Sequence, residues 1–449
     1  MREGSLEAPT RQPIDWQNPW FWDEAALEKE MERIFDICHG CRRCFNLCDS
    51  FPRLFDLIDN GPTGEIDGVP KEKYGEVVQA CTLCDMCFMT KCPYVPPHPW
   101  NVDFPHLMLR HRAVQAHKHG IDFVEAQLAD TDRLGRLGTF ASGLVNWATD
   151  ERNQPMRRTL EKAAGIHHGA RLPRQAAETF EALAHRSPPE LNTAAPAYGK
   201  RKAVLYATCF VNFHNTDIGR AALGVLARNG VATEVVHPAC CGMPKLELGD
   251  LEAVANAART VSAALLPWVD KGYDIVALTP SCALMLKFEW PLIQPQDPAI
   301  ERLAQASFDL SEYVVDIAKT HGLAEGLQPV EGGISLHLAC HARAQNMGAK
   351  GAEMLRLIPS TRVAVIERCS GHGGIWGTRS ENFEVAVKVG TPAAQAALKN
   401  NTSHVASECP LAAEHLVQVM EMAACQEKPE RLRADHPIEI LARAYGLME

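Results

Sequence analysis

Apolar positions change their spacing near residue 200, and this change divides the chain into two kinds of structure. Leu27, Met31 and Ile34 recur at helical spacing, with Asp23 placed to cap the first turn. The pattern is helical again from 104 to about 186. From Lys200 onward, short β-rich runs alternate with helical stretches, which predicts βαβ units on parallel sheets. The runs are AVLYA from Ala203, ATEVV from Ala232, DIVALT from Asp274, ISLHLA from Ile334, RVAVIE from Arg362 and SHVASE from Ser403.

Proline and glycine mark the segments that separate these regions. Residues 61–70 are rich in both and predict a turn-rich loop, and the prolines that follow Cys92 exclude a helix until past Pro105. A linker is predicted from Ser187 to Gly199. We therefore expect an N-terminal helical domain and two α/β domains, divided as 1–130, a helical segment and linker at 131–199, then 200–326 and 327–449.

Eight of the 16 cysteines stand in two tight runs near the N-terminus. The runs are Cys38-x2-Cys41-x2-Cys44-x3-Cys48 and Cys81-x2-Cys84-x2-Cys87-x4-Cys92-Pro93. This spacing is typical of ferredoxin-type domains with two iron–sulfur clusters, where the fourth cysteine of each run reaches the other cluster. Structural zinc is the alternative, but zinc sites usually draw ligand pairs from separate knuckles. We expect two [4Fe-4S] clusters, one on Cys38, Cys41, Cys44 and Cys92, the other on Cys81, Cys84, Cys87 and Cys48.

Each of the six β-rich runs ends on or shortly before a cysteine. Corresponding cysteines of the two halves lie 131, 128 and 127 residues apart, which indicates a duplicated domain. Because ligands gather at the carboxyl ends of parallel strands, the three loops of each half can converge on a metal site. Buried cysteines acting as small hydrophobes would explain one or two positions, but not the whole matching set. The predicted ligands are Cys209, Cys240, Cys241 and Cys282 in the first half, and Cys340, Cys369 and Cys409 in the second.

The two halves offer different donors. Cys240-Cys241-Gly242 in the first half corresponds to Cys369-Ser370-Gly371 in the second, so serine replaces one paired thiol. His337, His341 and His372 surround the second set, and an imidazole could complete a site that has lost a thiolate. The glycines after Cys369 do not fit a dinucleotide fingerprint, and no Walker loop, nucleophile elbow or HExxH motif occurs. We therefore expect no catalytic residues.

Composition narrows the classes of function. A net charge of −10 argues against a nucleic-acid partner, because phosphate neutralisation requires clustered Lys and Arg. The N-terminal residues lack the apolar region of an export signal, and no apolar run is long enough to span a bilayer. The cysteines are therefore interpreted as metal ligands in a reducing compartment. We expect a cytoplasmic protein whose contact with the membrane, on its inner face, is peripheral and made through a partner.

The chain resembles the heterodisulfide-reductase-related iron–sulfur proteins, which join a ferredoxin-type pair of clusters to two cysteine-rich "CCG" domains. The resemblance rests on the two N-terminal cysteine runs and on CCGMP from Cys240, PSC ending at Cys282, HLACH from His337 and CSGHGGIWG from Cys369. It implies that Cys209, Cys240, Cys241 and Cys282 bind metal. Met285 occupies the position of a fifth thiolate, which leaves a four-cysteine site for iron–sulfur or zinc. Ser370 and Ala412 leave three thiolates in the second domain, which implies a quinone, partner or weakened metal site.

These expectations describe an iron–sulfur electron-transfer subunit of an oxidoreductase complex rather than a stand-alone enzyme. Electrons would pass between a flavoprotein or other redox partner and a quinone or protein acceptor. One alternative is a thiol–disulfide reductase of the heterodisulfide-reductase type, acting at the CCG metal site. Another is an assembly factor with structural zinc, although redox clusters would be superfluous in a scaffold.

Overall fold

The computed structural model describes residues 7–423 and 433–448, so Cys425 lies outside the described residues. The N-terminal part is helical. Its helices are α1 (Glu24–Cys41), α2 (Ser50–Asp59), α3 (Tyr74–Gln79) and α4 (Phe104–His119), with a π-helical turn, η4, at Cys87–Lys91. A second group of helices follows: α5 (Phe123–Ala129), α6 (Thr131–Phe140), α7 (Ser142–Thr149), α8 (Gln154–Ala164) and α9 (Phe180–Arg186).

Helix α1 confirms the first predicted element and extends it. The Asp23 carboxylate accepts a hydrogen bond from the Ala26 amide at 3.0 Å, and Leu27, Met31 and Ile34 are buried on one face. The helix continues to Cys41, so two predicted ligands lie on its last turns rather than in a loop.

Two details of the N-terminal part differ from the sequence-based expectation. Helix α4 begins at Phe104 and includes Pro105, because a proline in the first turn has no amide hydrogen that the helix needs. Residues 60–73 form the predicted turns, but the packed helices α2 and α3 flank them and bury Phe51, Leu54 and Val77. Glycines and prolines locate the turns without revealing that their flanks enter the core.

The first parallel sheet has the strand order β2-β1-β3-β4. Lys202 pairs with Ala232, Ala203 with Asp274, and Ile275 with Ser307. Its strands are β1 (Lys202–Tyr206), β2 (Ala232–Val236), β3 (Asp274–Ala277) and β4 (Ser307–Asp309). Its helices are α10 (Cys209–Phe213), α11 (Thr216–Arg228), α12 (Met243–Glu247), α13 (Leu251–Val269), α14 (Pro280–Leu284), α15 (Trp290–Ile293), α16 (Pro298–Gln305) and α17 (Leu310–Thr320).

The second parallel sheet repeats this topology with the order β6-β5-β7-β8. Its strands are β5 (Ile334–His337), β6 (Val363–Ile366), β7 (His404–Ser407) and β8 (Ala434–Asp435). Its helices are α18 (Cys340–Ala344), α19 (Lys350–Leu355), α20 (Phe383–Asn400), α21 (Pro410–Ala423) and α22 (Pro437–Ala444). All six predicted strands are present, whereas the short edge strands β4 and β8 were not predicted. Runs of three and two residues are too short for an alternating pattern to mark them.

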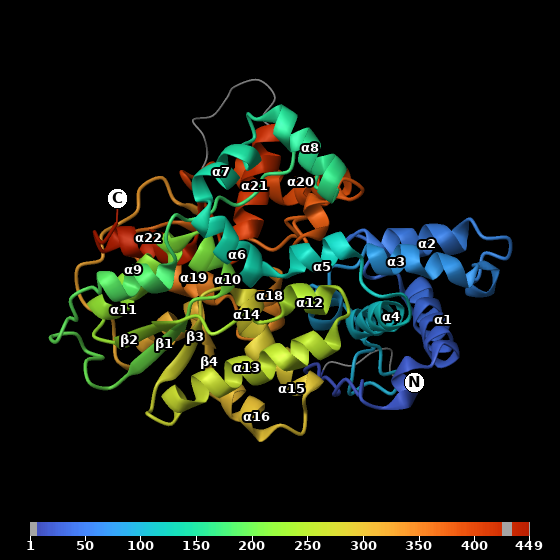
Figure 1. Ribbon diagram of the computed structural model, residues 1–449, viewed down its shortest axis with the longest axis horizontal. Helices are drawn as coiled ribbons and strands as arrows, with labels where there is room; N and C mark the ends of the chain where they lie inside the picture. Colours follow the sequence, from blue (N-terminus) through green and yellow to red (C-terminus); the bar gives the residue numbers. More distant parts are fainter. Residues whose placement is uncertain (1–6, 424–432, 449) are drawn as a thin grey trace.

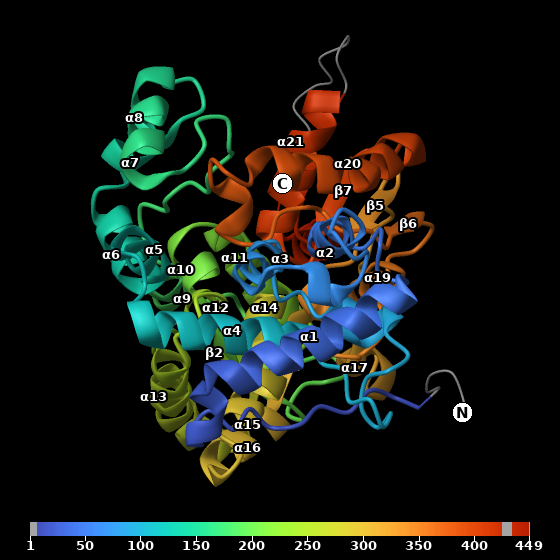
Figure 2. The ribbon, with the colours of Figure 1, turned by 90° about the vertical axis from the view of Figure 1, so that its right-hand side faces the viewer.

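Three hydrophobic clusters are found among the described residues, and one of them lies within the second unit, between β6, β7, α20 and α21. The other two join different parts of the molecule. One joins α1–α4 to α12–α16 of the first unit, and Figures 1 and 2 show the N-terminal helices against this side of the molecule. The other joins the two sheets through α11, α17, α19 and α22. Within the described ranges, no helix is long and apolar enough to cross a membrane. The packing brings the carboxyl ends of both sheets and the second N-terminal cysteine run to the same region.

Candidate metal centres

The first predicted cluster set comes together from distant parts of the chain. Cys38 and Cys41 lie on the last turns of α1, Cys44 follows in the next turn, and Cys92 follows η4. All four line one small cavity, together with Arg43 and apolar residues. Burial raises the pKa of the Cys38 thiol well above its ordinary value, and the neighbouring Cys92, Cys44 and Cys41 raise it further. The fourth cysteine of the second run therefore lies with the first three of the first run.

In the second predicted set, the fourth cysteine likewise comes from the other run. Burial raises the pKa of the Cys48 thiol, and the thiols of Cys84, Cys81 and Cys369 add to the effect in that order. The pKa of Cys87 is raised by burial and then by Cys84, with Cys44 of the first set next. The two sets are thus adjacent, and each receives its fourth thiol from the other run.

The loop that carries the second set is held in an unusual backbone shape. Leu83 and Asp85 have φ angles of 49° and 62°, in the left-handed region that non-glycine residues rarely adopt. The Asp85 carboxylate accepts two hydrogen bonds of 2.8 Å from the guanidinium of Arg11. Arg112 donates to the carbonyl oxygens of Cys81 and Val78. These arginines lie outside any metal-ligand motif, so the spacing of the cysteines does not point to either.

The four cysteines of the first α/β unit converge at the carboxyl ends of their strands. Cys209 follows β1, Cys240 and Cys241 follow β2, and Cys282 lies on α14 after β3. The sulfur atoms of Cys209 and Cys240 are 3.9 Å apart, and those of Cys241 and Cys282 are 3.1 Å apart. Hydrogen bonds with the Cys209 and Cys241 thiols lower the pKa of Cys240 well below its ordinary value. The four sulfur atoms thus form one connected hydrogen-bonded group.

Neighbouring side chains fix the Cys240 loop. The Asp132 carboxylate of α6 accepts hydrogen bonds from the Cys240 amide at 2.6 Å and from Nε2 of His237 at 2.8 Å. The indole of Trp290 donates to the Cys241 carbonyl at 3.1 Å. Asp132 was missed by the sequence analysis, because it lies 108 residues from the cysteine it holds. Met285 is fully buried in the core, and it does not line the cavity that lies between the two sheets.

The three cysteines of the second unit divide between two neighbourhoods. The pKa of Cys340 is raised by contact with the Cys369 and Cys84 thiols, and then by burial. Hydrogen bonds from the Cys340 thiol and from the Gly371 amide, whose nitrogen is 3.3 Å from the Cys369 sulfur, lower the pKa of Cys369 to about 7. Burial alone would raise this pKa. Burial raises the pKa of Cys409 to about 11, and the only thiol among its main neighbours is Cys282. Cys340 and Cys369 thus adjoin the second N-terminal set, whereas Cys409 adjoins the first α/β set.

The three histidines near this second set differ in the hydrogen bonds that their ring nitrogens make. His337 is buried and uses both ring nitrogens, on the Ser407 hydroxyl at 2.9 Å and the Arg368 carbonyl at 3.0 Å. Nδ1 of His341 bonds the Ser281 hydroxyl at 2.8 Å. His372 has a buried Nε2 with no hydrogen-bond partner among the described residues. Of the three, His372 has the open nitrogen that a ligand or metal could use.

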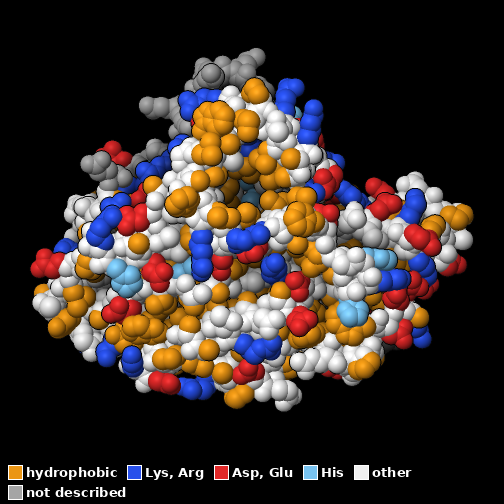
Figure 3. Space-filling model, viewed as in Figure 1, with side chains coloured by type: hydrophobic (Ala, Val, Ile, Leu, Met, Phe, Trp, Pro, Cys, Tyr) orange, Lys and Arg blue, Asp and Glu red, His pale blue; other side chains and the backbone are white. Residues whose placement is uncertain are grey.

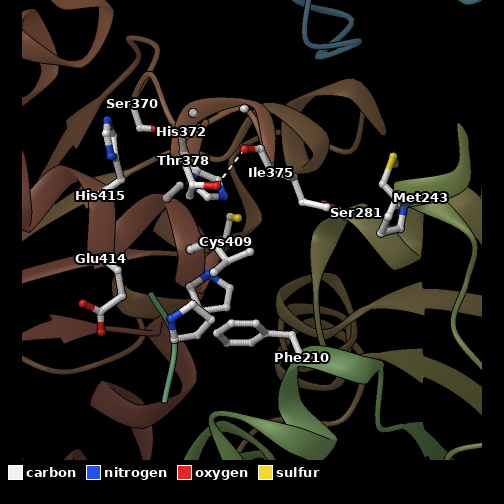
Figure 4. A pocket seen from close by; sticks show the side chains of 18 of the residues that line it. Phe210, Met243, Ser281, Ser370, His372, Ile375, Thr378, Cys409, Glu414 and His415 are labelled. Atoms are coloured by element: carbon white, nitrogen blue, oxygen red, sulfur yellow. Dashed lines mark hydrogen bonds between the residues drawn. The ribbon is translucent and has the colours of Figure 1, made fainter. Parts of the chain in front are cut away.

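A cavity of about 390 Å³ lies between the two sheets, and cysteines of both α/β units and Cys84 line it. Figure 4 shows side chains entering it from both sides, with Phe210 and Ser281 from the first unit and Cys409 and His372 from the second. Most of its wall is apolar. The site can therefore admit a molecule of moderate size directly beside the thiols.

The comparisons with known proteins agree with this arrangement. Residues 203–287 match the family model described as CCG, a cysteine-rich domain. The C subunit of anaerobic glycerol-3-phosphate dehydrogenase from Escherichia coli K12 is 26% identical over 322 residues, covering 71% of this chain and 76% of that protein. The B subunit of fumarate reductase (CoM/CoB) from Methanothermobacter marburgensis is 26% identical over 247 residues, 54% of this chain and 46% of that one. Lactate utilization protein A from Bacillus cytotoxicus is 27% identical over 188 residues, 40% of this chain and 75% of that one.

The chain therefore contains a CCG cysteine-rich domain and is homologous to iron–sulfur proteins related to heterodisulfide reductase. Among its relatives are proteins named as subunits of a dehydrogenase and of a reductase. The resemblance expected from the sequence motifs is confirmed.

Proposed function

We propose that this protein is an iron–sulfur electron-transfer subunit of a cytoplasmic oxidoreductase complex. A ferredoxin-type domain (1–130) would carry two [4Fe-4S] clusters, and a helical segment and linker (131–199) would lead to two CCG domains (200–326 and 327–449). Electrons would pass between a flavoprotein or other redox partner and a quinone or protein acceptor. Chains of one-electron centres suit this task, whereas a flavin in a partner can accept or release electron pairs.

The observation that carries the proposal is the exchange of the fourth cysteine between the two N-terminal sets. Cys92 shares a cavity with Cys38, Cys41 and Cys44, and Cys48 lies with the second run. Two clusters with exchanged ligands require this grouping, because three thiols in seven residues can reach three corners of one cluster while the fourth lies too far along the chain.

The spacing of the cysteines along the chain, rather than the spread of their sulfur atoms, favours clusters over single zinc ions at the N-terminal sites. Zinc holds sulfur at about 2.3 Å in a tetrahedron, which places its ligands less than about 4 Å from one another. In the described ranges, Glu161, His167 and His168 are the only three potential ligands whose donor atoms lie within 4.8 Å of one another. No three cysteine sulfurs of the described residues meet that criterion, either in the N-terminal sets or in the first α/β set, so the criterion does not distinguish the two kinds of site. The spacing of the cysteines along the chain is what favours clusters at the N-terminal sets.

The sites adjoin one another in an order that supports transfer through the molecule. Cys87 neighbours Cys44 of the first set, and Cys84 neighbours Cys340 beside the cavity. At the far side of the cavity, Cys409 neighbours Cys282. We propose that Cys209, Cys240, Cys241 and Cys282 hold a further iron–sulfur or zinc site, and that the second CCG domain holds metal weakly or not at all.

Anaerobic purification with quantification of iron, sulfide and zinc, followed by EPR of the reduced protein, tests this function. We expect about eight irons for the two N-terminal clusters. Cys92→Ser should remove the signal that Cys38→Ser removes, and Cys48→Ser should remove the other. Zinc without iron would refute the proposal, and Cys48→Ser matching Cys38→Ser would refute the exchanged ligation.

The second CCG domain allows a separate test. Ser370→Cys combined with Ala412→Cys restores the two thiols that the domain lacks. We expect this variant to bind more metal than the wild type. An unchanged metal content would show that factors other than the missing thiols set the weak binding.

The cavity also supports a second candidate function, a thiol–disulfide reductase of the heterodisulfide-reductase type. Its 390 Å³ could admit a disulfide beside the Cys240 and Cys369 sulfurs. Steady-state reduction of a heterodisulfide by the purified chain, supplied only with a one-electron reductant, would favour this alternative. We expect none, and we also expect no oxidation of glycerol-3-phosphate by the chain alone.

A further inference from the structure

Three donor side chains meet at the end of α8, away from all the cysteines. Glu161 lies on the last turn of α8, and His167 and His168 lie on the loop that follows. Nδ1 of His168 is 2.9 Å from Oε2 of Glu161, and Nε2 of His167 is 4.0 Å from Oε1. Within the described part of the chain, no other set of three potential ligands is drawn together as closely. Electron transfer through the cysteine sites gives this cluster no role.

The loop that carries the two histidines is fixed by its surroundings. The side chain of Arg157 is fully buried, and its guanidinium donates to the carbonyl oxygens of His167 at 3.1 Å, of His168 at 3.2 Å and of Ala170. The His167 ring also stacks on Phe383, with ring centroids 4.2 Å apart and planes at 15°. Donors that are held in place before a ligand arrives lose little conformational entropy when they bind it.

Two imidazoles and one carboxylate form a donor set that suits zinc. Such a set holds the ion with three protein ligands and leaves one position for water, at bond lengths of about 2.0–2.2 Å. Donors around one tetrahedral zinc ion then lie about 3.4 Å apart. The Glu161–His168 pair at 2.9 Å and the Glu161–His167 pair at 4.0 Å lie on either side of this value, so movements of roughly 1 Å would close the site.

The protonation of these donors also favours metal binding. Burial, and then the neighbouring His168, lower the pKa of His167, so this ring is neutral at neutral pH, as a metal ligand must be. The Ser380 hydroxyl donates to Oε1 of Glu161 at 3.1 Å and orients the carboxylate. A neutral ring carries one proton, so an ion on Nε2 of His167 would displace the 3.2 Å hydrogen bond from the Gly169 amide to Nδ1.

The cluster lies where the helical segment meets the second α/β unit. The amide of His167 donates to the carbonyl of Thr378 at 2.8 Å, close to the contact between Glu161 and Ser380. Ile166 and Thr378 both line the central cavity. Figure 3 shows hydrophobic side chains around a hollow, at the place where Figure 1 has α5 and α6 below α20 and α21. An ion on Glu161 would therefore fasten together two parts of the cavity wall that are distant in the sequence.

We propose that Glu161, His167 and His168 bind one divalent transition-metal ion, with Zn²⁺ as the ion that this donor set fits. The ion would take the place of the Glu161–His168 hydrogen bond and would keep a water molecule in its remaining position. Because Zn²⁺ does not change its oxidation state, the site would stabilise the cavity wall rather than carry electrons. The proposal goes beyond electron transfer and does not depend on which metal the cysteines hold.

Zinc binding by the full-length, iron-loaded protein tests this site. After anaerobic equilibration with Zn²⁺ and removal of the excess, the wild type should retain about one zinc ion per chain more than Glu161→Gln or His168→Gln. Each substitution should weaken the binding of this ion at least tenfold in a chelator competition. X-ray absorption should assign nitrogen and oxygen neighbours at about 2.0–2.1 Å to the zinc that the variants lose, with no sulfur at about 2.3 Å.

The matched control is His185→Gln combined with Glu190→Gln, which changes an exposed histidine and an exposed glutamate of the same part of the chain. This pair should retain as much zinc as the wild type, and all variants should keep wild-type circular dichroism and iron content. A wild type that retains no more zinc than Glu161→Gln and His168→Gln would overturn the proposal, and the three side chains would then form only a hydrogen-bonded contact. Sulfur neighbours around the zinc that the variants lose would also overturn it.

Discussion

The segment that precedes α1 is held by one buried arginine, Arg11, and loss of this side chain should weaken the packing of the whole N-terminal part. The side chain of Arg11 is 12% exposed and binds Asp85 and Asp103 at 2.8 Å and Glu289 at 3.2 Å. The three carboxylates come from the second cysteine loop, the start of α4 and the first α/β unit. In Arg11→Met they remain buried without their common cation. Removing one partner from a buried ion pair costs about 3–5 kcal/mol, so we expect a loss of that size.

The effect should depend on pH in a defined direction. Burial alone would raise the pKa of Asp103, but Arg11 and then His106 outweigh it and lower that pKa to about 2. The folded pKa is below the unfolded value of about 4, so this contribution is present above pH 4 and is lost as the pH falls toward 2. The difference in stability between wild type and Arg11→Met should therefore be largest near neutral pH and should shrink on acidification.

Urea unfolding under anaerobic conditions, followed by circular dichroism and by iron release, measures the loss. Arg33→Met is the matched control, because Arg33 pairs with Glu30 at side-chain exposures of 40% and 36%. Such an exposed pair contributes less than about 1 kcal/mol. The reasoning is refuted if the two substitutions shift the unfolding midpoint equally, or if the Arg11→Met deficit is as large at pH 3 as at pH 7.

Three further outcomes are expected. Gly135→Ala forces a Cβ atom against the Phe213 ring and should cost about 1–3 kcal/mol in urea unfolding, whereas Gly143→Ala, with open space, should stabilise its helix or leave it unchanged. Asp132→Ala removes the acceptor of the Cys240 amide and should weaken metal binding by the first α/β set about 10–100-fold, as measured by competition with a chelator, unless the loop holds its shape without that anchor. Burial raises the pKa of Glu247 to about 7, so its contribution is complete below about pH 4 and is lost as the pH rises toward 7. Glu247→Gln should therefore gain stability relative to the wild type between pH 5 and pH 8, and an unchanged difference would contradict this assignment.

Local spacing was sufficient to predict many elements of this protein and which cysteines stand at the ends of its strands. The helical period of Leu27, Met31 and Ile34 and the six β-rich runs each lie within a few consecutive turns or residues, so the sequence contains them directly. The same holds for the repeat of cysteines at strand ends. Edge strands β4 and β8 have too few residues to form a period, and α3 has only six. Helix α2 does carry a helical period in Phe51, Leu54, Phe55 and Ile58, so this element could have been predicted from the sequence.

Only the tertiary structure decided which distant groups meet. Arg11 reaches Asp85, Asp103 and Glu289 across as many as 278 residues, and no local pattern encodes such a contact. Cys340 neighbours Cys84 whereas Cys409 neighbours Cys282, and this division depends in the same way on how distant parts of the chain pack. Spacing along the chain determines which residues can share an element, whereas packing between elements determines which face of each remains free to bind.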